Sequence, residues 1–399
     1  MSIVVQKYGG SSVSSIEKIK NIAKNAIKRV NEGNKLVIVV SAMGDTTDDL
    51  LSMAKQISDN PDKRELDSLL STGEIVSSSL LSMAIKSFGY DSISFNSFQI
   101  QLKTEGVHGK SLIDDLNEKI IIDNLNKNKV VVIAGFQGVN NKGDITTLGR
   151  GGSDTTAVAL SVKLKGECEI YTDVDGIYSV DPRNYKSAKK IDKIDYEEIL
   201  ELASLGAQVM HSRSVELAQK YGTKIYVGQS LGEMNGTYIM EVKDMNLESK
   251  PVTGIATSDD DVALSIKNIS NNQNIISSIF SEIGENNINV DMISQTTPID
   301  NKINVSFTVP EGDLVECEQI LLKHVKREDI IIDKSICKFS VVGIGMKSTS
   351  GVAAKVFKIF NENNIVIKMV TTSEIRITCA INKEDKIKAI NLIAKEFNL

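Results

Sequence analysis

The segment "SIVVQKYGGSSV", residues 2–13, decides the fold of the first part of the chain. Its β-branched, apolar start is typical of a buried strand, and the pattern from Val13 onward predicts a helix with Ser11 or Ser12 as N-cap. Gly9 and Gly10 let the backbone approach an anion, and the free N–H groups at a helix start donate to it. Lys7 adds a positive charge, so the segment is typical of phosphate binding, although such a turn alone more often has no ligand.

Similar strand patterns recur along the first 229 residues and alternate with helical ones. Several of the runs are apolar throughout, which favours strands covered on both faces and therefore an α/β sheet sandwiched by helices. The predicted strands lie in the runs "KLVIVVSA", "SISF", "KVVVIAGF", "CEIYTD" and "KIYVG". Two apolar stripes at helical spacing predict core-facing helices, namely Ile16, Ile19, Ala23, Ala26 and Val30, and Val76, Leu80, Ala84 and Phe88.

Composition bounds the class of protein. The 399 residues are 41% hydrophobic and 25% charged, which predicts a multidomain soluble protein. A net charge of −6 argues against nucleic acid as a partner. The apolar runs are far shorter than the roughly 20 residues of a membrane helix, and the start lacks the features of a signal peptide. We therefore expect no membrane span and a cytoplasmic location, with the four widely spaced cysteines reduced and buried.

The last third of the chain contains an internal repeat. After a polar stretch from about Asp244 to Pro251, typical of a linker, "IFSEIGENNINVDMIS" (residues 279–294) matches "VFKIFNENNIVIKMVT" (residues 356–371) at a shift of 77. The pattern of each copy predicts the order strand, helix, turn, strand, hairpin, strand, helix. The region is therefore predicted to form two tandem βαββαβ units. Such units are typical of small-molecule sensing modules, and a structural or dimerising appendage is the alternative.

A second glycine-rich segment, "GFQGVNNKGDITTLGRGGSDTTAVAL" (residues 135–160), also follows a predicted strand and precedes a helix that begins near Ser153. Two such loops on one parallel sheet suggest a ligand lying across the strand ends. Arg150 has the planar fork that grips a carboxylate or a phosphate. Asp154 falls in the first helical turn, where a simple capping charge is the alternative.

Other chemistries are disfavoured by missing motifs. The only "GKS", at residues 109–111, lacks the earlier glycine of a Walker loop, and no G-x-G-x-x-G follows a strand. The acidic turn "YTDVDGIYSVDPR" (residues 171–183) lacks the calcium-binding pattern of an EF-hand. His108, His211 and His324 are expected to play structural rather than catalytic parts.

Taken in order, "KYGGSSV", "STGE", "TTLGRGGSDTTA", "YTDVDGIYSVDPR" and "GAQVMHSRSVELA", followed by a tandem repeat of the ACT type, resemble the aspartate kinase family. The resemblance covers essentially the whole chain and is to the monofunctional form. It implies an amino-acid-kinase-type sheet sandwiched by helices, followed by two α+β ACT domains of ferredoxin-like type. The implied limits are 1–243 for the catalytic domain, 252–332 for the first ACT domain and 333–399 for the second, and the two ACT domains could exchange a terminal strand.

The resemblance also implies an activity: phosphorylation of the L-aspartate side-chain carboxylate by ATP with Mg²⁺, the first step towards lysine, threonine and methionine. Lys7, Arg150 and Asp154 would be catalytic. The nucleotide would be held by Lys7, Gly9, Gly10, Ser11, Thr172, Asp173, Tyr178, Arg183 and Gln208. The aspartate site would be lined by Thr47, Glu74, Phe136, Arg150, Ser153 and Asp154, while the metal would arrive with ATP and need no protein site of its own.

One position departs from the family pattern. Relatives usually have lysine in "GAKV", where this chain has Gln208. An amide can still donate one hydrogen bond, so a lower affinity for ATP is the expectation.

For regulation, the resemblance implies an end-product amino acid bound at the turn after the first helix of an ACT domain. That turn contains residues 287–291 in the first copy and 364–368 in the second. Asn289, Val290 and Asp291 are the expected effector contacts, with Asp291 pairing with an effector ammonium group. The matching residue in the second copy is Lys368, so the two copies are expected to differ in binding. The expectation is inhibition by L-lysine, with L-threonine as a second candidate effector, in a homodimer or tetramer formed through the ACT domains.

Three alternatives stay open at this stage. A kinase acting on glutamate, acetylglutamate or a nucleoside monophosphate would share the Lys-Gly-Gly turn but is not expected to share "TTLGRGGSD". A noncatalytic amino-acid sensor is disfavoured by the intact Lys7, Arg150 and Asp154. A nicotinamide-dependent dehydrogenase with an ACT tail is disfavoured by the missing dinucleotide fingerprint.

Overall fold

A computed structural model describes residues 2–205, 210–230, 234–242, 250–270 and 273–399. The chain forms two compact units. The first comprises Met1–Ile177, Lys190–Ala203 and Gln208–Lys243, and the second comprises Tyr178–Lys189, Ser204–Ala207 and Asp244–Leu399.

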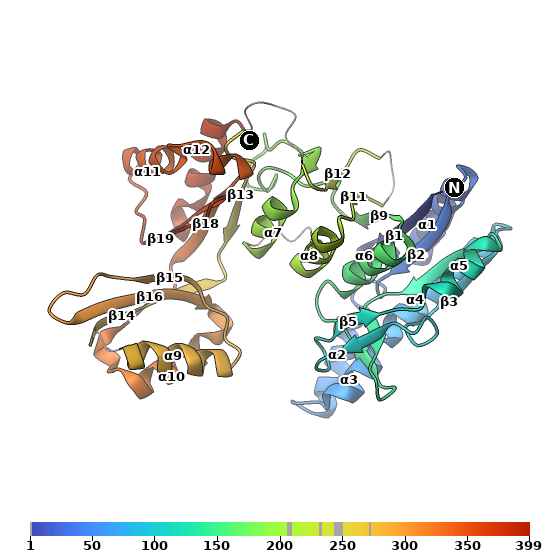
Figure 1. The fold of residues 1–399 in the computed structure, drawn as a ribbon, viewed down its shortest axis with the longest axis horizontal. Helices are drawn as coiled ribbons and strands as arrows, with labels where there is room; N and C mark the ends of the chain where they lie inside the picture. Colours follow the sequence, from blue (N-terminus) through green and yellow to red (C-terminus); the bar gives the residue numbers. More distant parts are fainter. Residues whose placement is uncertain (1, 206–209, 231–233, 243–249, 271–272) are drawn as a thin grey trace. The chain divides into compact units, whose positions relative to one another are not determined.

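The first unit is built on an eight-stranded sheet with the order β10-β12-β11-β9-β1-β2-β6-β3 (Figure 1). All of its neighbouring pairs are parallel except β11 and β12. All six predicted strands lie in it. The strands are β1 (Ile3–Tyr8), β2 (Lys35–Val40), β3 (Ser92–Phe95), β6 (Val130–Ala134), β9 (Glu167–Thr172), β10 (Lys193–Ile194), β11 (Ile225–Gln229) and β12 (Thr237–Ile239).

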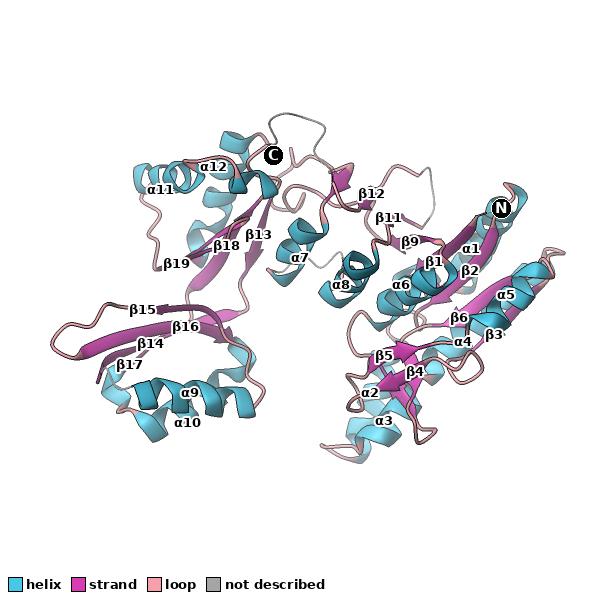
Figure 2. Cartoon of the chain, in the orientation of Figure 1, coloured by secondary structure: helices cyan, strands magenta, loops and turns pink. Residues whose placement is uncertain are grey.

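Helices cover both faces of this sheet, as the continuously apolar strands predict (Figures 1 and 2). α1 (Ile16–Asn31) and α4 (Thr72–Ser87) pack on one face, where their buried residues join Val4, Leu36 and Ile38 in one apolar cluster. The alternate residues of the strands, such as Val5 and Val37, are buried on the other face. That face carries α6 (Gly152–Leu164), with α5 (Glu118–Asn126) and α8 (Ser212–Tyr221) beside it.

A small second sheet in the first unit was not predicted. It has the order β5-β4-β7-β8 and consists of β4 (Lys103–Glu105), β5 (Leu112–Asp115), β7 (Gln137–Val139) and β8 (Ile145–Thr147). α3 (Lys63–Leu70) packs against β8, and α2 (Thr46–Ile57) packs against α3. This sheet matters for function because β8 leads directly into the second glycine-rich loop.

The predicted apolar stripe of α4 is partly wrong. Val76 is 52% exposed and Phe88 is 39% exposed, whereas Leu81 and Ile85 are fully buried. The helix buries a face that contains several serines besides its apolar residues, so the apolar periodicity alone indicated only part of the buried face. In the first stripe Ile16 is likewise 51% exposed.

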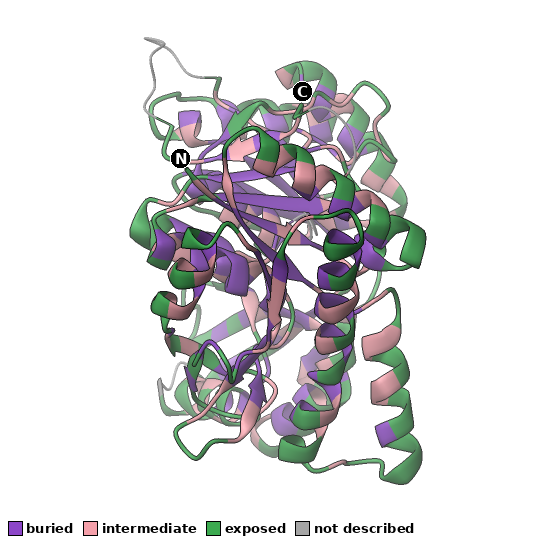
Figure 3. Ribbon diagram, turned by 90° about the vertical axis from the view of Figure 1, so that its right-hand side faces the viewer, coloured by how far each residue is buried: buried purple, intermediate pink, exposed green. Residues whose placement is uncertain are grey.

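Residues Lys63–Ser87 form a helical segment that is long and apolar enough to cross a membrane by those two criteria. The α4 part of this segment packs on β3, β6 and α1, as a core helix of a domain does. In Figure 3 the strands are largely buried, while the helices around them keep exposed outer faces.

The second unit contains the repeat as two four-stranded antiparallel sheets. The first sheet has the order β15-β16-β14-β17, with β14 (Asp261–Ser270), β15 (Asp291–Gln295), β16 (Lys302–Pro310) and β17 (Ile330–Asp333). The second has the order β13-β18-β20-β19, with β13 (Gly254–Ser258), β18 (Ile336–Val342), β19 (Met369–Thr372) and β20 (Arg376–Asn382). α9 (Gln273–Glu285) and α10 (Leu314–His324) accompany the first sheet, and α11 (Val352–Glu362) and α12 (Lys386–Phe397) accompany the second.

The strand that completes the second sheet comes from before the first repeat. β13 pairs with β18, so residues 254–258 precede the first copy in sequence but belong to the second in space. The two copies contact each other through Ala263, Met292, Ile336 and Ala380, with Met369 packed against them. Met292 and Met369 occupy matching positions of the repeat.

Candidate active site

The first glycine loop, residues 9–12, begins where β1 ends at Tyr8. The Gly9 N–H donates to Tyr171 O at 3.3 Å, and Gly10 O accepts from Gly44 N at 3.1 Å. These bonds attach the loop to the ends of the neighbouring strands β9 and β2. A short 3₁₀ turn, Gly10–Val13, follows, and α1 begins only at Ile16.

The predicted N-cap is therefore wrong. Ser15, rather than Ser11 or Ser12, caps α1, because its hydroxyl accepts from Lys18 N at 3.3 Å. The 3₁₀ turn delays the helix and leaves the serines at residues 11 and 12 beside the strand ends. Ser12 is hydrogen-bonded there, because its Oγ lies 2.5 Å from Ser230 Oγ. Ser230 Oγ in turn donates to Thr172 O at 3.3 Å.

The shape of this loop depends on the absence of a side chain at Gly10. A Cβ at that position would lie 2.9 Å from Ala42 O and 3.2 Å from Gly44 O, and both of these are backbone atoms. Within the described residues, the N–H groups of Gly10 and Ser11 have no hydrogen-bond partner. Two unpaired donors at the carboxyl end of a central strand suit an anionic ligand.

Lys7 lies beside these donors and connects the first glycine loop to α6. Its ammonium Nζ is 2.6 Å from Asp154 Oδ1, and the two side chains are only 12% and 13% exposed. Asp154 belongs to the first turn of α6, as the sequence predicts. The ion pair therefore brings together the two glycine-rich segments that the sequence indicated separately.

The second glycine loop, residues 147–153, runs from the end of β8 into α6. Gly149 and Gly151 both have left-handed backbone conformations, with φ of 77° and 68°, which other residues rarely adopt. Arg150 lies between them with an exposed side chain. Its guanidinium has no hydrogen-bond or ion-pair partner among the residues that the structure describes, so it is available to a ligand. Ser153 is buried at the start of α6.

Phe136 lies next to the start of α6. It has the left-handed φ of 69°, and a Cβ on Gly152 would lie 2.9 Å from its ring. Its carbonyl accepts from Leu148 N at 2.9 Å, which ties it to the second glycine loop. A non-glycine residue in this conformation stores backbone strain, a feature that concentrates at functional sites.

Glu74 is the most perturbed acid in this region. It is 3% exposed, and its Oε1 accepts from Ala42 N at 3.0 Å, whereas its Oε2 has no partner among the described residues. Burial raises the pKa of Glu74 to about 7, against the opposing effect of the Ala42 N–H. Thr47 stands in the first turn of α2, in the segment that follows β2 after Ala42.

Comparison with known proteins identifies the family. The model of the amino acid kinase family matches residues 2–229, and the model of the ACT domain matches residues 262–324 and 339–397. Aspartokinase 2 of Bacillus subtilis is 45% identical over 403 aligned residues, which cover 100% of this chain and 98% of that protein. This chain belongs to the aspartokinase family.

Solved aspartokinases share the fold. Crystal structures of Escherichia coli aspartokinase III match with TM-scores of 0.81, in complex with aspartate and ADP (R-state), and 0.80, in complex with lysine and aspartate (T-state). Both are 23% identical to this chain; the first match covers 98% of this chain and 99% of the other, and the second covers 99% of each. The catalytic sheet sandwiched by helices and the tandem ACT domains expected from the sequence are thus confirmed, as is the phosphotransferase class.

The residues expected to hold the nucleotide of this aspartokinase are not all in one unit. Thr172, whose hydroxyl donates to Asp173 Oδ1 at 2.9 Å, ends β9 beside the first glycine loop. Tyr178 and Arg183 belong to the second unit, where Arg183 donates from Nε and Nη2 to Asp181. Gln208 lies outside the described residues. The parts of Tyr178, Arg183 and Gln208 in nucleotide binding remain predictions.

The expected effector turn lies in the first ACT domain of this aspartokinase. Asn289 and Val290 precede β15, and Asp291 is its first residue. Asp291 Oδ2 is 3.2 Å from Lys338 Nζ, which is also 2.9 Å from Asp261 Oδ1. Burial opposes the charged form of Asp291, but the Met292 N–H and the Lys338 ammonium outweigh it and lower the pKa. The matching Lys368 pairs instead with Asp333 at 2.7 Å, so the two copies have different charges and partners.

Sequence reasoning missed three residues that shape this site: Ser230, Asp67 and Arg213. Ser230 follows β11 and links the ends of β1 and β9 through Ser12 and Thr172. Asp67 lies in α3, and Arg213 lies in α8 within a segment quoted only for its family resemblance. None of the three stands next to a glycine-rich loop in sequence, so only the fold shows their proximity.

Proposed function

We propose that this chain transfers the terminal phosphoryl group of ATP to the side-chain carboxylate of L-aspartate, giving 4-phospho-L-aspartate, the first step towards lysine, threonine and methionine. The observation that carries the proposal is the Lys7–Asp154 ion pair of 2.6 Å. It joins a loop with unpaired N–H donors to a loop that presents an unpaired guanidinium. A phosphate on the first and a carboxylic acid on the second would lie next to each other.

The chemistry at this site is mainly a problem of charge. A carboxylate acceptor with a pKa near 4 is already ionised at neutral pH, so it needs no general base. The acceptor and the triphosphate repel each other, and the loose transition state spreads negative charge over the equatorial oxygens. We assign the neutralisation of this charge to Lys7 and the unpaired N–H groups of Gly10 and Ser11; Gly9 lets the backbone approach the phosphate, while its own N–H donates to Tyr171 O. Asp154 holds the Lys7 ammonium in position before a phosphate arrives.

Mg²⁺ bound to the nucleotide phosphates supplies further neutralisation. The donors of the first glycine loop are N–H groups and an ammonium, which fit phosphate oxygens rather than a metal ion. Within the described residues, no three His, Cys, Asp or Glu side chains cluster in a way that could hold a metal. This donor set supports a metal that is carried by the nucleotide.

Selection of aspartate requires a cation for its α-carboxylate and anions for its ammonium. We assign the first part to Arg150, and the second to Glu74 and Asp154. The unpaired Oε2 of Glu74 supports this assignment, because a bound ammonium would supply the hydrogen bond that this buried atom lacks. Thr47, Phe136 and Ser153 would line the rest of the site.

Thr172, Asp173, Tyr178, Arg183 and Gln208 would hold the nucleotide. Thr172 is linked to Ser12 of the first glycine loop through Ser230, and this supports the assignment of Thr172. Gln208 in place of the lysine usual in relatives lowers the affinity for ATP in this proposal. Measurement of the KM for ATP in a Gln208→Lys variant tests it, and an unchanged value would refute it.

For regulation we infer feedback inhibition by L-lysine, with L-threonine as a second candidate effector, through Asn289, Val290 and Asp291. E. coli aspartokinase III has been solved in complex with lysine and aspartate in the T-state, and this lysine complex supports the inference. The same proposal includes a cytoplasmic homodimer or tetramer formed through the ACT domains, with domain limits of 1–243, 252–332 and 333–399.

Trapping of the acyl phosphate tests the reaction. The purified protein is incubated with Mg-ATP, hydroxylamine and aspartate, and the hydroxamate is measured; parallel reactions contain glutamate or acetylglutamate instead. Hydroxamate formed only with aspartate is the expected result, and its loss on adding lysine tests the effector in the same assay. A preference for another acceptor would overturn the proposal.

A further inference from the structure

The second glycine loop raises a physical question. The Arg150 guanidinium has no hydrogen-bond or ion-pair partner among the described residues, so no polar contact fixes its direction before aspartate binds. The flanking Gly149 and Gly151 have φ of 77° and 68°, and glycine has more backbone freedom than any other residue. The direction of Arg150 is therefore set by whatever holds the backbone of the loop.

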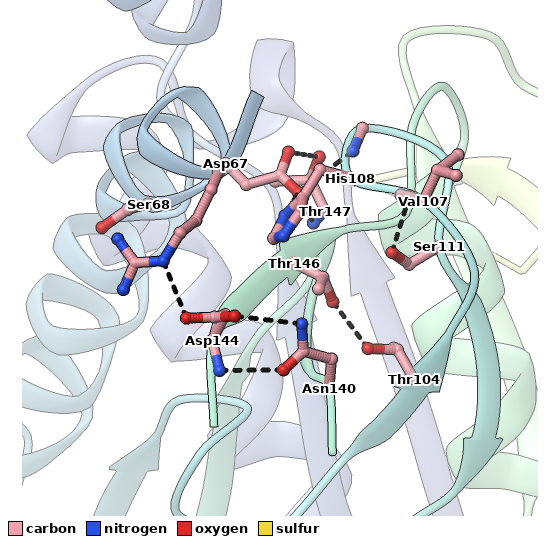
Figure 4. A network of polar contacts seen from close by, with 12 residues as sticks. Asp67, Ser68, Thr104, Val107, His108, Ser111, Asn140, Asp144, Thr146 and Thr147 are labelled. Atoms are coloured by element: carbon pink, nitrogen blue, oxygen red, sulfur yellow. Dashed lines mark hydrogen bonds and ion pairs between the residues drawn. The ribbon is translucent and has the colours of Figure 1, made fainter. Parts of the chain in front are cut away.

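One holding group is the carboxylate of Asp67, which comes from α3 and is 1% exposed. Its Oδ1 accepts from Thr147 Oγ1 at 2.5 Å, and its Oδ2 accepts from Thr147 N at 3.0 Å. Oδ2 also accepts from Gly109 N at 3.0 Å and lies 2.8 Å from His108 Nδ1 (Figure 4). One buried carboxylate thus ties the first residue of the loop to the β4–β5 hairpin.

A second holding group is the guanidinium of Arg213, from α8. Its Nη1 donates to Leu148 O and its Nη2 donates to Ser111 O, both at 2.7 Å. The Arg213 guanidinium therefore links the second glycine loop to the β4–β5 hairpin, which Asp67 also contacts from α3. Ser111 N also donates to Thr147 O at 3.0 Å, so the hairpin runs directly along the loop.

Close packing at both glycines completes the arrangement. A Cβ on Gly149 would lie 2.9 Å from Gly109 O, and a Cβ on Gly151 would lie 2.2 Å from His211 Cβ. The loop has little room to move on these sides. Asp67 and Arg213, the two charged groups that hold the loop, come from helices far apart in sequence.

We propose that Asp67 and Arg213 are positioning residues, here called the loop clamp, which hold residues 147–151 so that Arg150 is presented to the α-carboxylate of aspartate. This inference rests on the proposed function, because it takes the Arg150 contact with aspartate from there. The clamp acts on acceptor binding and not on the nucleotide, since it touches no residue of the first glycine loop in any described hydrogen bond. A displacement of a binding group by about 1 Å can cost up to a hundredfold in rate, so such support has measurable value.

The test is a double-mutant cycle in the full-length enzyme. Asp67→Asn removes the carboxylate but keeps the volume, and we expect it to raise the KM for aspartate about tenfold with the KM for ATP within about twofold. In an Arg150→Ala background the same substitution should have almost no further effect, because the clamp works through Arg150. Free energies that add in the double variant, or equal rises in both KM values, would overturn the clamp.

Controls separate the clamp from general structural damage. Asp144→Asn is the matched control, because Asp144 lies just before β8 and accepts from Arg64 Nε at 2.7 Å on the exposed side of the same small sheet. It should leave both KM values unchanged. If Asp67→Asn fails to fold, Thr147→Val removes only the hydroxyl donor and should give a smaller rise in the KM for aspartate alone. Thr147→Val with wild-type KM values would then count against the clamp.

The two proposals fail in different ways. If Arg150→Ala alone leaves the KM for aspartate unchanged, the assignment of Arg150 in the proposed function is wrong. If Arg150→Ala raises that KM and neither Asp67→Asn nor Arg213→Lys does, only the loop clamp is wrong.

Discussion

Lys7 Nζ and Asp154 Oδ1 lie 2.6 Å apart, although 146 residues lie between Lys7 and Asp154 in the sequence. Lys7 is at the end of a central strand and Asp154 is in the first turn of α6. The pair joins the two glycine-rich segments on which the account of the active site depends. Its charged groups are mostly shielded from water, so removal of either partner should have a large effect.

Lys7→Met should lower kcat by about a hundredfold or more, because preorganised cationic groups act most strongly on the transition-state charge. The KM for aspartate should change by no more than about threefold, since Lys7 faces the phosphate in this account. Steady-state kinetics with each substrate varied check both values. A variant with wild-type turnover would remove Lys7 from the mechanism.

Glu74 makes stability depend on pH. Burial raises its pKa from 4.5 to about 7, so the folded state binds the proton more tightly than the unfolded state. The contribution of Glu74 to the free energy of unfolding is fully present below pH 4.5 and is lost as the pH rises through about 7. The pKa shift is equivalent to about 3 kcal/mol. Glu74→Gln should therefore be more stable than the wild type at pH 8 by a few kcal/mol and equally stable near pH 4.5, as urea unfolding would show.

The same group should control aspartate binding. In the proposed site the charged form of Glu74 pairs with the substrate ammonium, so the KM for aspartate should fall between pH 6 and pH 8 in the wild type. Glu74→Gln should have a higher KM that is flat over this range. A wild-type KM that rises with pH would contradict the part assigned to Glu74.

Gly10→Ala should destabilise the protein by about 1–3 kcal/mol, since its Cβ would lie 2.9 Å from Ala42 O, a backbone atom that cannot rotate away. Gly9→Ala is the matched control, because a Cβ there lies 3.6 Å from Lys7 Nζ and its φ of −70° suits any residue. Thermal melts of both variants check the difference. Equal melting temperatures would show that the first glycine loop tolerates a side chain at either position.

The fold of the catalytic part could be predicted where sequence and burial agree. β6 is apolar along its whole length, β2 is apolar after Lys35, and β1 begins with three apolar residues; the strands are largely buried, so their patterns had one interpretation. The small sheet escaped prediction because its strands have only three or four residues and two of them are largely polar. The helix α4 was predicted in the right place, but its buried face was predicted only in part, because that face contains Ser77, Ser78 and Ser82.

The candidate site was predictable only as separate segments. The motifs indicated Lys7, Arg150 and Asp154, and the parallel sheet indicated that strand ends would share an edge. Nothing local in the sequence shows that Asp67 reaches Thr147, or that Arg213 bridges Leu148 and Ser111. These contacts join elements that are distant in sequence, and they depend on tertiary structure rather than on any periodicity.

Asp291→Asn should abolish or weaken lysine inhibition by at least about tenfold, because the amide cannot pair with an ammonium group as a carboxylate does. Asp261→Asn is the matched control. Both carboxylates contact Lys338 Nζ, at 3.2 Å and 2.9 Å, but only Asp291 lies in the effector turn. Inhibition curves for the two variants distinguish an effector contact from an ion pair between the repeats. Equal loss of inhibition in both would assign the effect to the ion pair.

The most direct test of the central claim is the response of Arg150→Ala to each substrate. The claim is that the second glycine loop binds aspartate while the first glycine loop binds the phosphates of ATP. The account predicts that the KM for aspartate rises by more than about tenfold, as loss of a charge-assisted contact should cause, while the KM for ATP changes by less than about twofold. Equal rises in the two constants, or no rise for aspartate, would contradict it.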